Sequence, residues 1–69
     1  MHEVWVIRKQ KADGNYSFYA CMFGMTPDWV DNIENAKHFT TEQKAQKAFS
    51  EVSIYALGSE ILKVKVNTI

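Results

Sequence analysis

The strongest constraint on the fold is a pair of β-prone segments on either side of Asp13 and Gly14. Residues 3–9 and residues 16–23 are rich in β-branched and aromatic side chains, which is typical of strands. Asp13-Gly14 is a turn signal, because glycine adopts a positive φ without steric cost and aspartate tolerates one. The sequence therefore predicts an antiparallel hairpin.

The first strand of this hairpin carries apolar side chains on both faces, which is typical of a central strand in a sheet. A two-residue turn places Ile7 opposite Ala20 and Arg8 opposite Tyr19. One face then carries Trp5, Ile7, Phe18, Ala20 and Met22, and the other carries Val4, Val6, Arg8, Tyr19, Cys21 and Phe23. A longer loop changes this pairing, so the register depends on the loop length.

The segment after Gly24 reads as the start of a short helix. Thr26 can cap it, Pro27 suits the first helical position, and Asp28 favours the positive end of the helix dipole. Trp29, Val30 and Ile33 can then face inward. Residues 36–39 either end this helix or form a short edge strand, and the pattern leaves both open.

The main helix is expected to begin near residue 40, where Thr40 and Gln43 fit a capping box. An apolar stripe at helical spacing follows, made of Ala45, Ala48, Phe49, Val52 and Ala56. Gly58 is a natural stop. Residues 59–69 alternate between apolar and polar side chains, which predicts a closing strand with one dry face.

These elements predict a single α+β domain over residues 1–69. Their order is strand, strand, short helix, an optional short strand, main helix and strand. The simplest assembly is a three- to four-stranded antiparallel sheet with the main helix packed on one face.

Composition excludes several classes of protein. The eight basic and eight acidic residues give a net charge of zero, so there is no general attraction to nucleic acid or an anionic membrane. No apolar run is long enough to span a bilayer, and the first residues do not form a signal peptide. Cys21 is the only cysteine, which rules out an internal disulfide. We expect a cytoplasmic protein without a membrane segment, in which Cys21 is a small buried hydrophobe.

The sequence shows no constellation that would carry catalysis. No serine lies in a nucleophile elbow, no glycine-rich phosphate loop is present, and His2 and His38 have no ligand-like spacing to other groups. We therefore expect no catalytic, metal or cofactor-binding residues, and a protein that is not an enzyme.

One candidate surface is basic and aromatic. Residues 8–11 would join Lys63 and Lys65 if the first and last strands are neighbours, beside Tyr16, Phe18 or Tyr19. Such sheet surfaces bind single-stranded RNA or DNA. The competing interpretation is a strand edge that lysines protect from aggregation. The neutral net charge favours the second interpretation.

The other candidate surface is apolar. Residues 16–25 are rich in aromatic side chains and methionine, and two helical segments are too few to cover both faces of so apolar a sheet, unless residues 26–39 cover the rest. We therefore hypothesise a protein-binding surface. Its candidate anchors are Trp5, Tyr16, Phe18, Tyr19 and Trp29, and its candidate rim charges are Arg8, Lys9, Lys63 and Lys65. Some of these side chains must belong to the core. Self-association into a homodimer is an equal candidate, because a domain this small has no disulfide or metal to stabilise it.

Several short segments resemble small, mostly uncharacterised proteins of phage and prophage genomes. The segments are Trp5-Val6-Ile7, Gly14-Asn15-Tyr16, residues 29–33, residues 36–41 with Ala45, and Val64-Lys65-Val66. The resemblance implies an accessory protein without an active site, similar to inhibitors of bacterial defence systems such as anti-CRISPR proteins. Its partner would be a host or defence protein whose surface it occludes.

Overall fold

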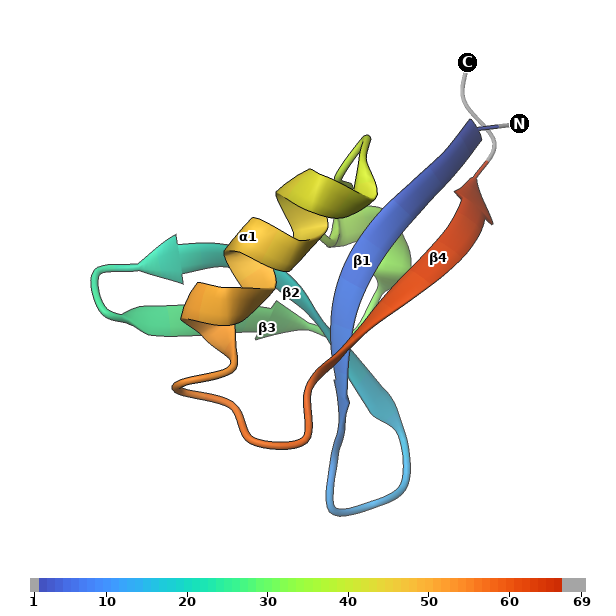
Figure 1. The fold of residues 1–69 in the computed structure, drawn as a ribbon. Coiled ribbons are helices and arrows are strands. Elements are labelled where there is room, and N and C mark those ends of the chain that lie inside the picture. The colour runs from blue at the N-terminus through green and yellow to red at the C-terminus, as the bar shows by residue number, and fades with distance from the viewer. Residues whose placement is uncertain (1, 67–69) are drawn as a thin grey trace.

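The computed structural model describes residues 2–66, which form a four-stranded antiparallel sheet and one α-helix (Figure 1). The elements, in chain order, are β1 (His2–Gln10), β2 (Tyr16–Phe23), β3 (Thr26–Val30), the 3-10 helix η1 (Ile33–Asn35), α1 (Glu42–Val52) and β4 (Glu60–Val66). The predicted α+β class, with an antiparallel sheet and one main helix on one of its faces, is confirmed.

The strands follow the order β3-β2-β1-β4 across the sheet. β1 is therefore an inner strand, as its two apolar faces predicted. The first and last strands are neighbours over seven residue pairs, from His2 opposite Val66 to Arg8 opposite Glu60. The closing strand ends at Val66 in the structure, and the rest of the expected range, 67–69, lies outside the described residues.

The predicted register of the first hairpin is wrong by one residue. Arg8 lies opposite Phe18 rather than Tyr19, because the strands are joined by a five-residue loop, residues 11–15, instead of two residues. Gly14 has a φ of 91° and the Lys11 N–H bonds to the Asn15 carbonyl oxygen at 2.6 Å, which closes the loop. The shift exchanges the faces of β2 relative to β1, so that Ile7 lies on the face of Tyr19 and not of Phe18.

The predicted short helix at Thr26 is also wrong, because this segment is the strand β3. It pairs with β2 from Phe18 opposite Val30 to Phe23 opposite Thr26. Pro27 fits here because β3 is an edge strand, where a residue without an N–H costs little. Pairing with β2 stabilises this segment as a strand more than the local helix signals stabilise it as a helix.

Residues 36–39, which the sequence left open, form an insert between β1 and β2. These two strands pair only at three positions, from Arg8–Phe18 to Gln10–Tyr16, and then diverge. Phe39 fills the gap through an isolated bridge to Trp5, with two backbone hydrogen bonds of 2.9 Å. The Lys37 N–H bonds to the Tyr19 carbonyl oxygen on the opposite side at 2.9 Å. The insert thus connects the two halves of the sheet.

The main helix begins one residue later and ends earlier than its sequence signals suggest. The N-cap is Thr41, whose hydroxyl accepts a hydrogen bond from the Lys44 N–H at 3.2 Å, and not Thr40. The α-helix ends at Val52 rather than near Gly58. One further turn returns Ala56 to the core, where it is buried.

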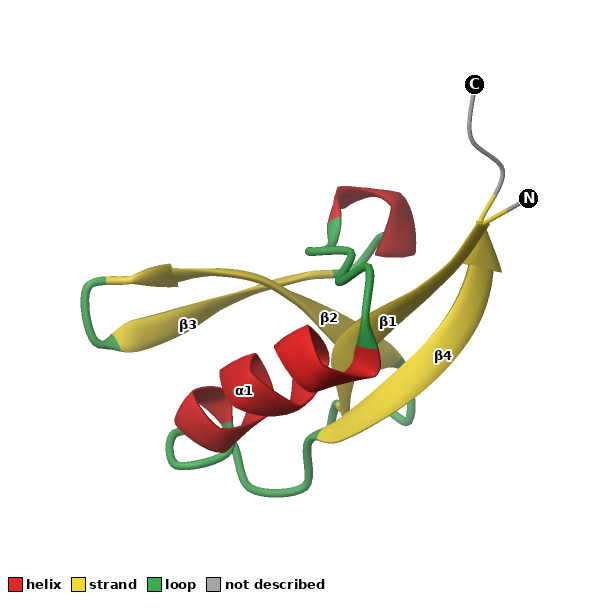
Figure 2. Ribbon diagram, turned by 45° about the horizontal axis from the view of Figure 1, so that its top comes forward, coloured by secondary structure: helices red, strands yellow, loops and turns green. Residues whose placement is uncertain are grey.

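The core lies between α1 and one face of the sheet. It consists of Ile7, Tyr19, Phe39, Ala45, Val52 and Ala56, with Trp5, Met22, Trp29, Ala48, Phe49 and Ile61 packed around them. Figure 2 shows α1 on one side of the sheet and η1 on the other. On this second side Val4 and Val6 are buried, so both faces of the sheet are partly covered.

Candidate protein-interaction site

The nine side chains proposed from the sequence do not form one surface. The register places Trp5, Lys9, Tyr19, Trp29, Lys63 and Lys65 on the face that carries α1, and places Arg8, Tyr16 and Phe18 on the other face. Tyr19 belongs to the core and is 7% exposed. It makes an edge-to-face contact with Trp29 at a centroid distance of 6.1 Å, and burial raises the pKa of its hydroxyl, with smaller contributions from Cys21 and Glu51.

Several of the predicted rim charges are already satisfied within the domain. Arg8 pairs with Glu60 at 2.9 Å and stacks over the Tyr16 ring at 4.1 Å. Lys63 pairs with Glu3 at 2.8 Å, which raises the pKa of the lysine. Lys9 lies over the Trp29 ring at 4.7 Å. Arg8 and Lys63 therefore already have acidic partners, which weakens the case for a phosphate-binding face.

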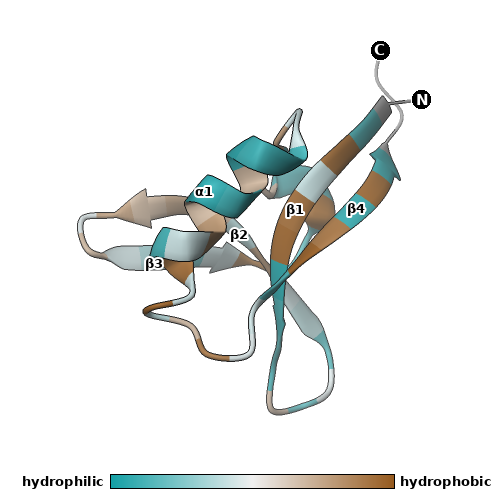
Figure 3. Ribbon diagram, viewed as in Figure 1, coloured by the Kyte–Doolittle hydropathy of each residue, from teal (hydrophilic) through white to brown (hydrophobic). Residues whose placement is uncertain are grey.

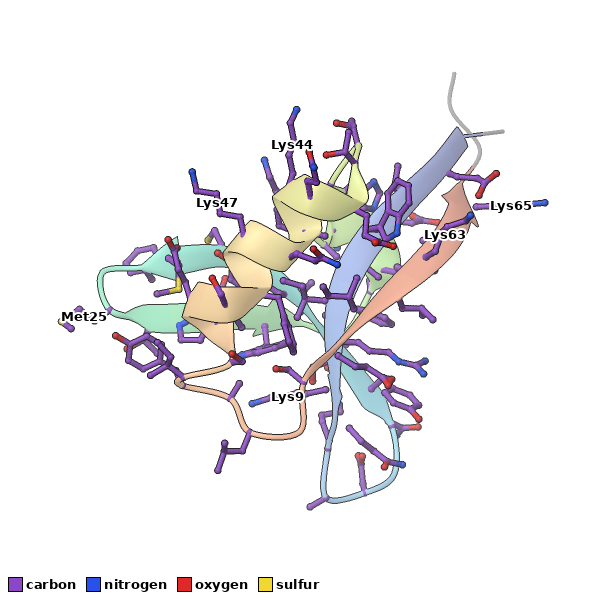
Figure 4. All side chains as sticks on the ribbon, in the orientation of Figure 1. Lys9, Met25, Lys44, Lys47, Lys63 and Lys65 are labelled. Carbon is purple, nitrogen blue, oxygen red and sulfur yellow. The ribbon has the colours of Figure 1, made fainter. Side chains whose placement is uncertain are left out.

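Apart from Tyr16, the large exposed hydrophobic side chains of the described residues lie elsewhere, at the end of the molecule formed by the β2–β3 turn and the loop after α1. We call this surface the apolar end. It comprises Phe23, Met25, Ile54, Tyr55 and Leu57, which are 80%, 74%, 73%, 49% and 93% exposed. Figures 1 and 2 both place the turn and the loop at the same end of the molecule, and Figure 4 shows Met25 projecting beyond the turn. In Figure 3 strongly hydrophobic positions interrupt the loop after α1.

Local backbone geometry explains why these residues are exposed. Gly24, with a φ of 65°, makes the β2–β3 turn tight, so that Phe23 and Met25 flank its tip. Ile54 and Leu57 follow the end of the α-helix at Val52 and lie outside the apolar stripe that packs on the sheet, so both are exposed. Phe23 and Met25 belong to the stretch that the sequence analysis singled out. Ile54 and Leu57 were not identified from the sequence. The available signal was that both apolar residues lie outside the helical stripe.

A second feature is a groove of about 240 Å³ between β2 and α1. Its lining residues are Tyr19, Ala20, Cys21, Met22, Lys37, Phe39 and Ala48. The expectation that Cys21 is buried is wrong, because a β-bulge between Tyr19 and Cys21 turns the strand and leaves the cysteine exposed. The groove has a mixed lining of apolar and polar groups, with Lys37 as its charged member.

Within residues 2–66, no group of three or more histidine, cysteine, aspartate or glutamate side chains is arranged to hold a metal ion. His38 instead places its Nε2 atom 2.9 Å from the Ile33 carbonyl oxygen, a contact that ties the residues before α1 to η1. None of the described helices is long and apolar enough to cross a membrane.

Comparisons with known proteins found no relative of this chain. No protein-family model matches the chain, and no curated protein and no solved structure is significantly similar to it.

Proposed function

We propose that this protein is a non-enzymatic interaction module that binds another protein through its apolar end. The observation that carries this proposal is the exposure of Phe23, Met25, Ile54 and Leu57 at one end of so small a domain. Large apolar side chains that a small domain leaves exposed often mark a protein interface, because their contact with water is unfavourable. Methionine and aromatic residues are also enriched in interfaces, and charged groups are depleted from their centres.

The resemblance to phage accessory proteins supports a specific setting for this activity. In that setting the partner is a host or anti-phage defence protein, and binding inhibits it by covering a functional surface. A second copy of the chain is the competing occupant of the same surface. Both occupants require the apolar end, and they differ in whether the free protein is a monomer.

The test compares partner capture by two variants. Leu57→Ser combined with Met25→Ser removes two of the most exposed apolar side chains, and Tyr16→Ser removes an apolar side chain that is outside the apolar end. Immobilised wild type and Tyr16→Ser should retain the same protein from a bacterial lysate, and the double variant should lose it, as measured by quantitative mass spectrometry. Equal retention by all three proteins, or by none, contradicts the proposal.

Light scattering distinguishes a second copy of the chain from a different protein as the occupant of the apolar end. A dimer in the wild type that dissociates in the double variant assigns the apolar end to self-association. A monomer in both leaves the surface free for a different protein.

Single-stranded nucleic acid is the alternative ligand, and it predicts a different outcome. Binding to RNA or single-stranded DNA should then be strong at low salt and fall steeply as salt is added. The ion pairs of Arg8 and Lys63, and the separation of the aromatic side chains onto two faces, favour the protein ligand instead.

A further inference from the structure

The groove between β2 and α1 runs along a strand edge that lacks a partner strand in the described part of the chain. β2 pairs with β3 along one side as far as Phe23, but its pairing with β1 on the other side ends at Phe18. The only backbone hydrogen bond to this side beyond Phe18, within residues 2–66, comes from the Lys37 N–H to the Tyr19 carbonyl oxygen. An unpaired strand edge is a template for the addition of another strand.

Apolar side chains form part of the wall of the groove. Met22 and Tyr19 contribute from β2, Phe39 from the insert between the strands, and Ala48 from α1. Ala48 is small, which leaves room between the helix and the strand. A strand laid along β2 would therefore place alternate side chains against an apolar surface.

One lysine lines this groove, and two more lie near Ala48 on α1. Lys37 lines it directly, Lys44 lies one helical turn before Ala48, and Lys47 is the neighbour of Ala48. Figure 4 shows Lys44 and Lys47 projecting from the same side of α1, away from β4. None of the three takes part in an ion pair among the described residues, and Lys44 only donates to the Thr40 hydroxyl at 3.4 Å. Glu51 contributes to the raised pKa of Tyr19, so one acidic side chain acts on a residue of the groove, but it does not line the groove.

We infer that this groove binds an extended, acidic peptide segment of a partner protein, which adds to β2 as a further strand. Its backbone pairs with the free edge of β2, its apolar side chains contact Met22 and Phe39, and its carboxylates face the three lysines. The inference goes beyond the proposed function, because it concerns a different surface and names the chemistry of the ligand.

Cys21 provides a direct reporter of occupancy, because it is the only cysteine of the chain and its exposed thiol lines the groove. The probe is an end-capped hexapeptide that alternates aspartate or glutamate with valine. We expect it to slow the reaction of Cys21 with a disulfide reagent in the full-length protein. It should also shift the amide resonances of residues 19–22, 37 and 48. Added salt should weaken this binding severalfold, because the lysines are exposed and screened.

Two charge reversals with the same change in net charge identify the site. Lys44→Glu places a negative charge beside the groove, and it should not unfold the helix because an acidic residue near the helix N-terminus is favourable. Lys65→Glu makes the same change on β4, away from the groove (Figure 4). We expect Lys44→Glu to weaken binding by about three- to tenfold. Lys65→Glu should leave it unchanged within about twofold, the difference expected for a distant screened charge.

Two further peptides test the chemistry of the ligand. A hexapeptide with lysine in place of the acids should bind at least about tenfold more weakly, because it meets like charges. An acidic hexapeptide with alternate amides N-methylated should lose protection of Cys21, since it cannot pair with the β2 edge.

The inference is overturned if the acidic peptide leaves Cys21 unprotected, if the lysine peptide protects it equally, or if both charge reversals weaken binding to the same degree. Retained binding of the N-methylated peptide overturns strand addition. Each of these results is independent of the partner capture that tests the apolar end, because Leu57→Ser with Met25→Ser leaves the residues of the groove intact.

Discussion

Ile7 lies at the centre of the core between the sheet and α1 and has no exposed surface. Ile7→Val removes one buried methylene, so we expect the free energy of unfolding to fall by about 0.5–1.5 kcal/mol. Urea denaturation measures this as a lower midpoint at an unchanged slope. Leu57→Ala is the control, because Leu57 is almost fully exposed and its loss should change stability by less than about 0.5 kcal/mol. A similar loss in both variants would show that Leu57 is packed.

Asp13 stabilises the loop between β1 and β2 through its carboxylate. Its Oδ1 atom accepts a hydrogen bond from the Asn15 N–H at 2.9 Å, and this bond lowers the pKa of the carboxyl below its ordinary value. The contribution to stability is therefore present above the unfolded pKa, about 3.9, and is lost as the pH falls through the lower folded pKa.

Asp13→Asn keeps an oxygen at this position but removes the titration. We expect the stability of the wild type to fall more steeply than that of the variant as the pH decreases below about 4. Thermal unfolding at a series of pH values measures the two slopes. Parallel slopes would mean that the Asn15 bond does not distinguish the charged carboxylate from the neutral one.

At the scale of elements, strands with strong periodicity were predictable and the segment from Thr26 to Val30 was not. The bounds of β2 and the inner position of β1 follow from residues that are apolar on both faces. Thr26, Pro27 and Asp28 carry genuine helix-start chemistry, but such signals are worth only about 1 kcal/mol each. Pairing with β2 and packing Trp29 against the core outweigh them. Local propensity could not reveal this, because the decisive contacts are made across the sheet.

The candidate site was partly predictable for the same reason. The aromatic stretch through Phe23 and Met25 identified one side of the apolar end. Asp13-Gly14 did not reveal the length of the loop between β1 and β2. The resulting error of one residue in the register assigned Phe18 and Tyr19 to the wrong faces. The groove depends on where β1 and β2 diverge, which no local pattern encodes.

Two adjacent threonines at the start of α1 test which residue caps the helix. Thr41→Ala removes the hydroxyl that accepts the Lys44 N–H, so we expect a loss of about 1 kcal/mol. Thr40→Ala is the matched control, because Thr40 only accepts a long bond from the exposed Lys44 side chain and should cost less than about 0.5 kcal/mol. Chemical denaturation of both variants measures the difference. The opposite order would move the cap to Thr40, where the sequence pattern placed it.

At the scale of the whole molecule, the sheet consists of two two-stranded ribbons, β1 with β4 and β2 with β3. A short junction, the pairing of β1 with β2, joins them. β1 pairs with β4 over seven residue pairs and β2 pairs with β3 over five, but β1 and β2 share only three. The insert at residues 37–39 bridges the gap, and the buried Phe39 side chain joins the core shared by both ribbons. This divergence both creates the groove beside β2 and makes Phe39 responsible for coupling the ribbons.

Phe39→Leu tests this coupling, because it loosens the junction without introducing a polar group. We expect it to cost about 1–2 kcal/mol in the free energy of unfolding. It should also speed hydrogen exchange at the Trp5 amide, which donates to the Phe39 carbonyl oxygen, beyond the increase shared by the other core amides. Phe49→Leu is the control, since Phe49 packs on the same core from α1 and should raise exchange without selecting Trp5. If both variants change the Trp5 amide equally, the ribbons are coupled by the whole core and not by the insert.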